Sequence, residues 1–166
     1  SGAEVVIFNA PHQLRRYDSH SGNVLQAVDC DGQPHHLAYS PDGRWIALSY
    51  FHRPDVEFRD ANNLNLVVHR FAQSLGGIQR ISFSPSGRYM VAGLRNGGII
   101  SWDLESLNTL DDDWVTANIS GLAQEQPILP HSGCVSAVAI TDEHRVLSGS
   151  EDGSVAYSDF RPRFAE

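Results

Sequence analysis

The sequence predicts an all-β protein that is built from repeated, four-stranded antiparallel sheets. Three observations support this fold class. A turn motif recurs, because SPDGRW at 40–45 returns as SPSGRY at 84–89, a spacing of 44 residues. Short runs rich in β-branched and aromatic residues flank each turn, as in β-hairpins. No segment shows the sustained 3.6-residue periodicity of an amphipathic helix, so the sequence predicts no helix.

The repeated turn has a physical basis in its proline and glycine residues. Pro41 and Pro85 restrict φ to values near −65° early in the turn, and Gly43 and Gly87 can adopt the positive φ that closes it. A weaker version of the motif, TDEHRV, starts at 141, which is 57 residues after SPSGRY. The longer interval predicts an insertion of about 13 residues between the second and third copies of the turn.

Strand-like runs then follow one another along the chain in units of similar order. The expected strands lie at 3–9, 13–18 and 23–28; 35–40, 45–50, 55–61 and 64–71; 78–84, 89–94 and 97–104; and 135–141, 146–151 and 153–160. With an outer strand counted in the third unit, the expected total is fourteen strands. The first unit lacks its innermost strand and the last unit lacks its outer strand.

One run in each unit ends in a polar or aromatic residue followed by Asp. Trp102-Asp103 is the literal Trp-Asp pair, and the degenerate versions are Tyr17-Asp18, Arg59-Asp60 and Ser158-Asp159. A period of 40–45 residues, four strands per unit and this pair resemble the WD-repeat (WD40) β-propeller family. The resemblance extends along essentially the whole chain and implies the architecture, but it says little about function.

The resemblance implies about three and a half propeller blades. The units are about 1–30, incomplete; 31–72; 73–130, with an inserted loop at 111–127; and 131–166, incomplete. Closed propellers typically have 4–8 blades. The sequence therefore predicts part of a larger ring, whose remaining blades come from the same parent protein or from another chain.

A set of residues in the last two units is expected to have a structural role. In the family, a hydrogen-bond chain of His, Ser, Asp and Trp fixes each blade, and His131, Ser148 and Asp152 match its first three members. Ser158 occupies the Trp position in the last unit, whereas Trp102 and Asp103 form the pair in the third. A hydrolase site is not predicted, because no G-x-S-x-G motif surrounds Ser148.

The inserted loop at 111–127 is the first candidate for partner binding. It combines an acidic triplet, which includes Asp112, with Trp114. Long loops on a rigid scaffold often carry binding residues. The alternative is a solvated loop with Trp114 folded back onto the blade.

Arginine residues at turns and strand ends form a second candidate surface. In propellers, the turns after the second strands share one face with the loops between blades, so Arg53 and Arg95 are expected near the insertion. Such a face suits an acidic or phosphorylated peptide. Arg161 is a further candidate, because a family subset that ends in Trp-Asp-x-Arg binds the adaptor of cullin-RING ubiquitin ligases. Arg59 occupies a Trp position, where a buried charge needs a partner.

Composition excludes several classes of function. The net charge of −8 disfavours a general nucleic-acid role, and no apolar run is long enough to cross a membrane. No signal segment opens the sequence, and the well-separated Cys30 and Cys134 read as free thiols, so an intracellular protein, cytoplasmic or nuclear, is expected. No metal-binding spacing and no cofactor motif is present.

These observations predict a non-catalytic scaffold that binds peptides or domains of other proteins in a multi-protein complex. One alternative is a regulatory or targeting propeller domain of a larger enzyme. Another is a substrate-receptor subunit of a ubiquitin ligase. The sequence names neither the partner nor the pathway.

Overall fold

The structure is a computed structural model that describes residues 4–9, 12–71, 76–105 and 128–160. Within these residues, thirteen strands form four antiparallel sheets. The first sheet contains β1 (Glu4–Asn9), β2 (Gln13–Asp18) and β3 (Val24–Asp29). The second contains β4 (Pro34–Tyr39), β5 (Trp45–Tyr50), β6 (Val56–Asp60) and β7 (Val67–Phe71). The third contains β8 (Ile78–Phe83), β9 (Tyr89–Leu94) and β10 (Ile99–Asp103). The fourth contains β11 (Val135–Ile140), β12 (Arg145–Ser150) and β13 (Val155–Asp159).

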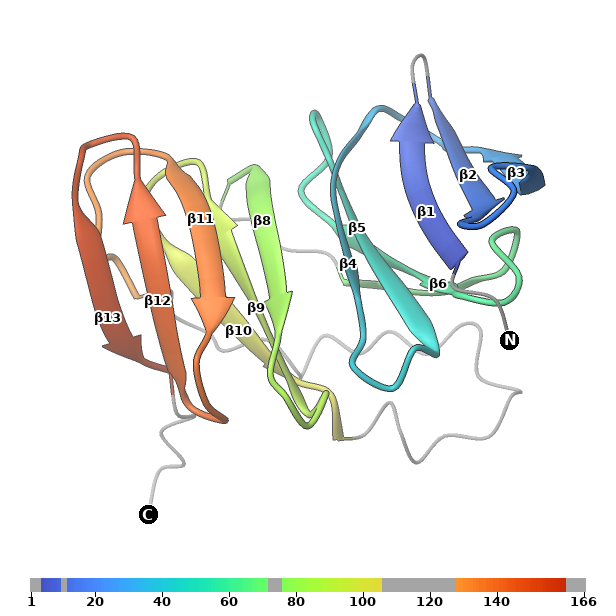
Figure 1. Cartoon of the computed structure of the whole chain (residues 1–166). Coiled ribbons are helices and arrows are strands. Elements are labelled where there is room, and N and C mark those ends of the chain that lie inside the picture. The colour runs from blue at the N-terminus through green and yellow to red at the C-terminus, as the bar shows by residue number, and fades with distance from the viewer. Residues whose placement is uncertain (1–3, 10–11, 72–75, 106–127, 161–166) are drawn as a thin grey trace.

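Each sheet is a meander in which strands that follow one another in the chain pair side by side. The four sheets stand next to each other in chain order, with the first and the fourth at opposite ends (Figure 1). In the third sheet, the backbone of Ile128 pairs with Ile99 at the outer edge of β10, through hydrogen bonds of 2.8 and 3.0 Å. The outer strand expected for this unit otherwise falls within 106–127, outside the described residues.

The turns between the first two strands of the second and third sheets have the same construction. Gly43 and Gly87 have φ of 72° and 75°, and a serine hydroxyl accepts the backbone N–H of the residue five positions later. The backbone N–H of Ser40 also donates to Trp45, and that of Ser84 to Tyr89. The proline and glycine pattern therefore closes these hairpins.

The corresponding turn of the fourth sheet is one residue shorter, and this corrects the spacing inferred from the sequence. Here Thr141 donates its backbone N–H to the carbonyl of Arg145, four residues later. Arg145 thus occupies the place of Tyr89, and the strands of the third and fourth sheets correspond at a spacing of 56 residues rather than 57. A turn without proline or glycine shifted the apparent alignment by one position.

Side chains alternate across each strand, so every sheet has two faces. We call the face toward the preceding sheet the front face and the face toward the following sheet the back face. In β9, Met90 and Ala92 lie on the front face and pack against the second sheet, whereas Val91 lies on the back face and packs against the fourth. Three hydrophobic clusters, one at each contact between neighbouring sheets, form the core.

The contact between the third and fourth sheets depends on a glycine. A Cβ atom at Gly93 would lie 2.4 Å from Cγ1 of Val135, which is far closer than two carbon atoms can approach. The inner strand β11 therefore packs directly onto the backbone of β9. At the corresponding position of the last sheet, a Cβ atom at Gly149 would meet only Ala137, at 4.0 Å.

The two outermost faces of the stack expose apolar side chains. Val5 and Ile7 are exposed on the front face of the first sheet, and Leu147, Val155 and Tyr157 are exposed on the back face of the fourth. No hydrophobic cluster among the described residues joins the first sheet to the fourth. In this structure the four sheets form an open stack rather than a closed ring of four.

Candidate interaction surfaces

Three turns lie along one edge of the stack, at the top in Figure 1, and we call this edge the turn edge. They are the turns at 51–55, 95–98 and 151–154. Each begins with the same backbone hydrogen bond to the segment that precedes the inner strand of its sheet: Phe51 donates to Gln33, Arg95 to Gly77 and Glu151 to Cys134, at 2.9 to 3.0 Å. Arg53 and Arg95 therefore share one edge.

Arg53 is tied into its own sheet. Its guanidinium group donates to both carboxylate oxygens of Asp55, at 3.0 and 2.5 Å, and to the backbone carbonyl of Asp31 at 2.6 Å. It also lies over the ring of Tyr50, 4.4 Å from the ring centroid. These contacts use most of the N–H donors of the guanidinium group. Arg53 therefore stabilises the second sheet and has few donors left for a ligand.

Arg95 is exposed at the turn edge, beside a polar group on the inner strands. Nε2 of His35 lies 3.1 Å from the side-chain oxygen of Gln79 and 3.4 Å from Nη1 of Arg80. Burial, together with the charges of Arg80 and Arg95, lowers the pKa of His35, whereas the hydrogen bond to Gln79 opposes the shift. Arg95 and Arg80 therefore act on the same small region, where the second and third sheets meet.

The remaining predicted partner-binding residues, Asp112, Trp114 and Arg161, lie outside the described residues. The residues on either side of 106–127 are described, and they lie at opposite edges of the third sheet. Leu104 donates its backbone N–H to Arg88 at the edge away from the turn edge, whereas Ile128 pairs with Ile99 beside the turn edge. The expected proximity of the insertion to Arg53 and Arg95 stays a prediction.

His131, Ser148 and Asp152 come together in the fourth sheet. Nε2 of His131 lies 2.7 Å from the hydroxyl of Ser148, and Nδ1 lies 2.6 Å from the hydroxyl of Ser154. Ser154 in turn donates to Asp152, whose other carboxylate oxygen accepts the backbone N–H groups of Ser132 and Gly133. His131 reaches Asp152 mainly through Ser154, since their direct separation is 4.0 Å.

This network links the segment before β11 to the second strand and the following turn, so it fastens the sheet internally. Hydrogen bonds from the side chain and backbone of Ser154, followed by the backbone of Ser132, hold the pKa of Asp152 far below its usual range. Ser148 is buried, and its hydroxyl is bonded to His131 within this network. Sequence reasoning did not single out Ser154, although the SEDGS turn places it two residues after Asp152.

The Trp position holds a different residue in each sheet. Trp102 is buried and packs against Phe71 of the second sheet, with ring centroids 5.9 Å apart. The carboxylate of Asp103 accepts a hydrogen bond of 2.9 Å from Arg88. In the second sheet the position holds Arg59, which is also buried.

Glu57 is the partner that the buried charge of Arg59 requires. Its side chain is completely buried and accepts hydrogen bonds from Tyr50 and Arg59 at 2.7 Å, while Arg70 forms an ion pair at 2.8 Å. Burial raises the pKa of Glu57, but the hydrogen bond from Tyr50 and the charge of Arg59 outweigh it, so the net shift is downward. Sequence reasoning missed Glu57, although its place two residues before Arg59 puts both side chains on one face of the strand.

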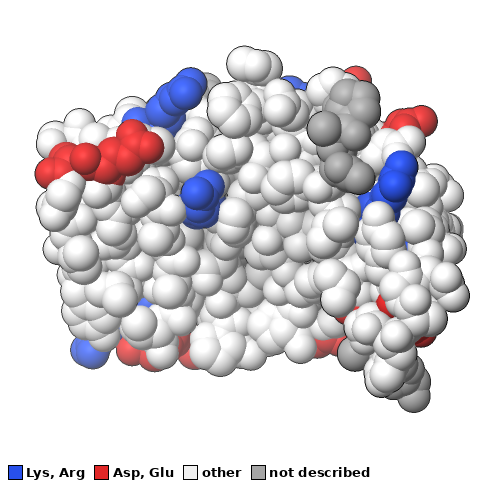
Figure 2. Space-filling model, turned by 45° about the horizontal axis from the view of Figure 1, so that its top comes forward, with Lys and Arg blue, Asp and Glu red and all other residues white. Residues whose placement is uncertain are grey.

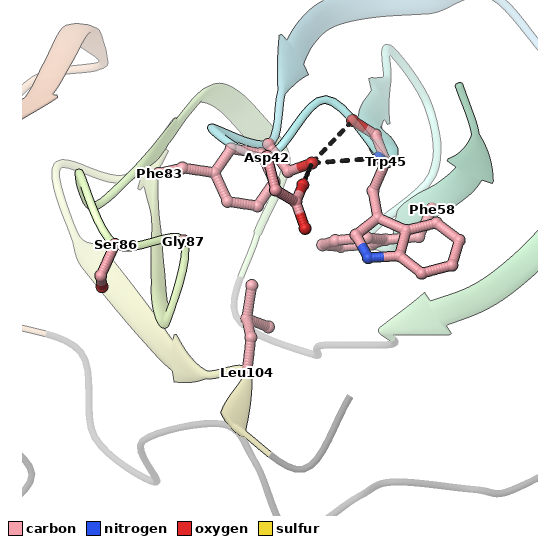
Figure 3. Close-up of a pocket in the computed structure, with 8 residues that line it drawn as sticks. Asp42, Trp45, Phe58, Phe83, Ser86, Gly87 and Leu104 are labelled. Atoms are coloured by element: carbon pink, nitrogen blue, oxygen red, sulfur yellow. Dashed lines mark hydrogen bonds between the residues drawn. The ribbon is translucent and has the colours of Figure 1, made fainter. Parts of the chain in front are cut away.

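A small hollow lies between the second and third sheets, at the edge opposite the turn edge. Trp45 and Phe58 of the second sheet and Phe83 and Leu104 of the third point toward it, and Asp42 accepts the hydroxyl of Ser40 beside it (Figure 3). Its volume is about 20 Å³, which has room for about one water molecule. Small-molecule sites are typically larger by more than tenfold.

Charges and metal ligands are dispersed over the described part of the chain. Figure 2 shows arginine side chains as separate spots on the visible face, with acidic side chains at its margins and no continuous basic patch. Within the described residues, no group of three His, Cys, Asp or Glu side chains could hold a metal ion, and no helix could cross a membrane. The two cysteines are not joined by a disulfide.

Comparison with known families finds the same repeat. The family model of the WD domain, G-beta repeat, matches residues 66–103 and 124–157. The first match runs from β7 through β10, so it joins the outer strand of the second sheet to the three strands of the third. The second match contains Ile128, β11, β12 and the first three residues of β13. Comparison with curated proteins found no significant match. The matched stretches show that the chain contains WD40 repeats, and its four antiparallel sheets fit the blades of a β-propeller.

Proposed function

We propose that this protein is a non-catalytic scaffold that binds acidic or phosphorylated peptides of other proteins at its turn edge. WD40 repeats generally serve as protein-interaction scaffolds. The observation that carries the proposal is the position of Arg95, which is exposed on the turn that follows β9. An exposed guanidinium group beside a rigid sheet suits a carboxylate or phosphate group.

The surroundings of Arg95 favour a short ligand with few charges. The charges of Arg80 and Arg95 both lower the pKa of His35, so these two guanidinium groups lie close to the same small part of the surface. The arginines visible in Figure 2 are separated by neutral surface, which does not suit a long polyanion. A peptide with one or two acidic or phosphorylated residues matches this charge distribution.

Peptide binding provides the test. Arrays of acidic and phosphoserine peptides identify ligands, whose dissociation constants are then measured by calorimetry for the wild-type chain and for Arg95→Ala. We expect Arg95→Ala to weaken binding by about ten- to a hundredfold, because a hydrogen bond to a charged group contributes about 1.5–3 kcal/mol. Arg44→Ala is the matched control, since Arg44 is exposed at the opposite edge. Failure of every peptide to bind, or equal affinity for Arg95→Ala, would contradict the proposal.

A further inference from the structure

Equivalent positions on the back faces of the four sheets differ sharply in exposure. The strands β2, β6, β10 and β13, one in each sheet, end in Asp18, Asp60, Asp103 and Asp159. The residue four positions before this Asp lies on the back face. In the first three sheets this residue is Leu14, Val56 or Ile99, and each is 0 % exposed because the next sheet covers it. In the fourth sheet it is Val155, which is 73 % exposed. Tyr157, the next residue on that face, is also exposed.

The front faces show the same difference at the other end of the stack. In each of the last three sheets, a front-face residue of the second strand pairs with the residue just before the terminal Asp. These front-face residues are Ile46, Met90 and Val146, and each is 0 % exposed. In the first sheet the corresponding residue is Val5, which is 46 % exposed. Ile7, which corresponds to the buried Leu48 and Ala92, is exposed as well.

The three internal contacts therefore share one plan, in which a back-face residue of one sheet and a front-face residue of the next enter the same cluster. Leu14 joins Ile46 in the first contact, Val56 joins Met90 in the second, and Ile99 joins Val146 in the third. At the two ends of the stack, the front face of the first sheet and the back face of the fourth are each one half of such a contact. Among the described residues, no front-face side chain of another sheet covers Val155, and no back-face side chain covers Val5.

We propose that two copies of this chain associate head to tail, with the front face of the first sheet of each copy on the back face of the fourth sheet of the other. One chain carries both an exposed front face and an exposed back face. The proposed contact therefore joins two different faces. Such contacts generate closed rings when the rotation permits. The described residues of two copies hold eight sheets, and closed propellers of up to eight blades are known.

The proposed contact uses residues other than those of the turn edge, so it is independent of peptide binding through Arg95. Burial of several aliphatic side chains supplies the driving force, at about 25 cal/mol per Å² of apolar surface removed from water. Val5 and Ile7 are exposed on one outer face and Leu147, Val155 and Tyr157 on the other, and large exposed apolar patches often mark interaction sites. On the first of these faces the central strand β2 also carries Arg15, whose guanidinium group is bonded to Gln13 of the same strand.

Sedimentation equilibrium on the full chain tests the proposal, with wild type expected at twice the 18.3 kDa of one chain. Val5→Asp and Val155→Asp each place a charge on one half of the contact and should each yield a single-chain species. Leu129→Asp is the control, because Leu129 is 65 % exposed but lies on neither outer face, and it should leave the mass unchanged. Circular dichroism confirms that each variant is folded.

Mixing the two variants identifies the geometry. Val5→Asp retains an intact fourth sheet and Val155→Asp retains an intact first sheet, so the mixture should form a two-chain species through one unaltered contact. That species is held by one contact instead of two, so its dissociation constant should exceed the wild-type value by about 10²-fold or more. The proposal is overturned by a wild-type chain that stays single up to submillimolar concentration, by a mixture that does not recombine, or by association that Val155→Asp abolishes and Val5→Asp leaves intact. The last result would indicate a symmetric pairing of two fourth sheets.

Discussion

At the scale of single residues, the second sheet shows how a repeat tolerates the loss of its tryptophan. The position before Asp60 holds Arg59, and its buried charge is balanced by Glu57. An unpaired buried charge is strongly destabilising, so Arg59 and Glu57 depend on each other. Tyr50 and Arg70 occupy further acceptor sites of the carboxylate, which leaves the cluster hydrogen-bonded on several sides.

Removal of one donor from this cluster should lower stability measurably. Tyr50→Phe deletes the hydroxyl that donates to Glu57 at 2.7 Å while it keeps the ring. We expect the free energy of unfolding to fall by about 1.5–3 kcal/mol, because the acceptor is a buried carboxylate. Tyr39→Phe is the matched control, since Tyr39 is exposed, and it should change stability by less than about 0.5 kcal/mol. Urea denaturation measures both, and equal values for the two variants would show that the hydroxyl of Tyr50 contributes nothing special.

At the scale of elements, the close approach of neighbouring sheets limits side-chain size at particular positions. Gly93 and Gly149 occupy equivalent places in β9 and β12, but only Gly93 is covered by an inner strand of the next sheet. The same substitution at both positions therefore separates the effect of packing from the effect of strand propensity.

Gly93→Val should destabilise the protein, whereas Gly149→Val should be close to neutral. At Gly93 the new side chain would overlap Val135 and push β11 away from β9, which typically costs about 1–3 kcal/mol. At Gly149 the added Cβ atom would make only an ordinary contact with Ala137, at 4.0 Å, and valine favours strands more than glycine does. Denaturant midpoints of both variants provide the measurement, made at a protein concentration low enough to keep single chains. A larger loss for Gly149→Val would show that the proposed packing is incorrect.

The contact between the second and third sheets also contains a group that titrates. Nδ1 of His36 accepts the backbone N–H of Ile81 at 3.2 Å, so it must be unprotonated to hold this bond. Burial, followed by the neighbouring charges of Arg80 and His35, lowers the pKa of His36 to about 4. An unfolded chain releases this constraint, and its histidines titrate near 6.5.

Stability should therefore fall as the pH drops from about 6.5 to about 4, because in this window the unfolded state binds more protons than the folded state. Above this range the contribution of His36 is complete. His36→Gln keeps an acceptor but does not titrate, so we expect a shallower pH dependence for the variant than for wild type. Denaturant unfolding at a series of pH values measures the difference, and identical slopes would exclude His36 as a source.

At the scale of the whole molecule, the four sheets are joined by three similar contacts and end in two uncovered halves. Local reasoning on the sequence identified nearly every strand, because turn residues and alternating apolar residues mark them directly. It could not say which partner Arg59 would have, nor that the turn at 141–145 is one residue short, since both depend on the folded structure.

Part of the candidate surface was also accessible from the sequence. The place of Arg53 and Arg95 on one edge follows from the order of strands, which repeats from sheet to sheet. The difference between them does not, because Arg53 is held by Asp55 and Asp31 whereas Arg95 extends from its turn into solvent. Charged side chains choose partners by proximity after folding, which a pattern along the chain does not reveal.

The sequence by itself determined the repeat, the hairpins and the all-β class, since glycine and proline restrict the backbone locally and side chains alternate along a strand. Only the tertiary structure decided which arginines are paired, that Ser154 connects His131 to Asp152, and which apolar residues stay uncovered. The physical reason is the distance along the chain over which each kind of interaction acts. Backbone preferences act over a few residues, whereas burial and ion pairing join residues from separate strands and sheets.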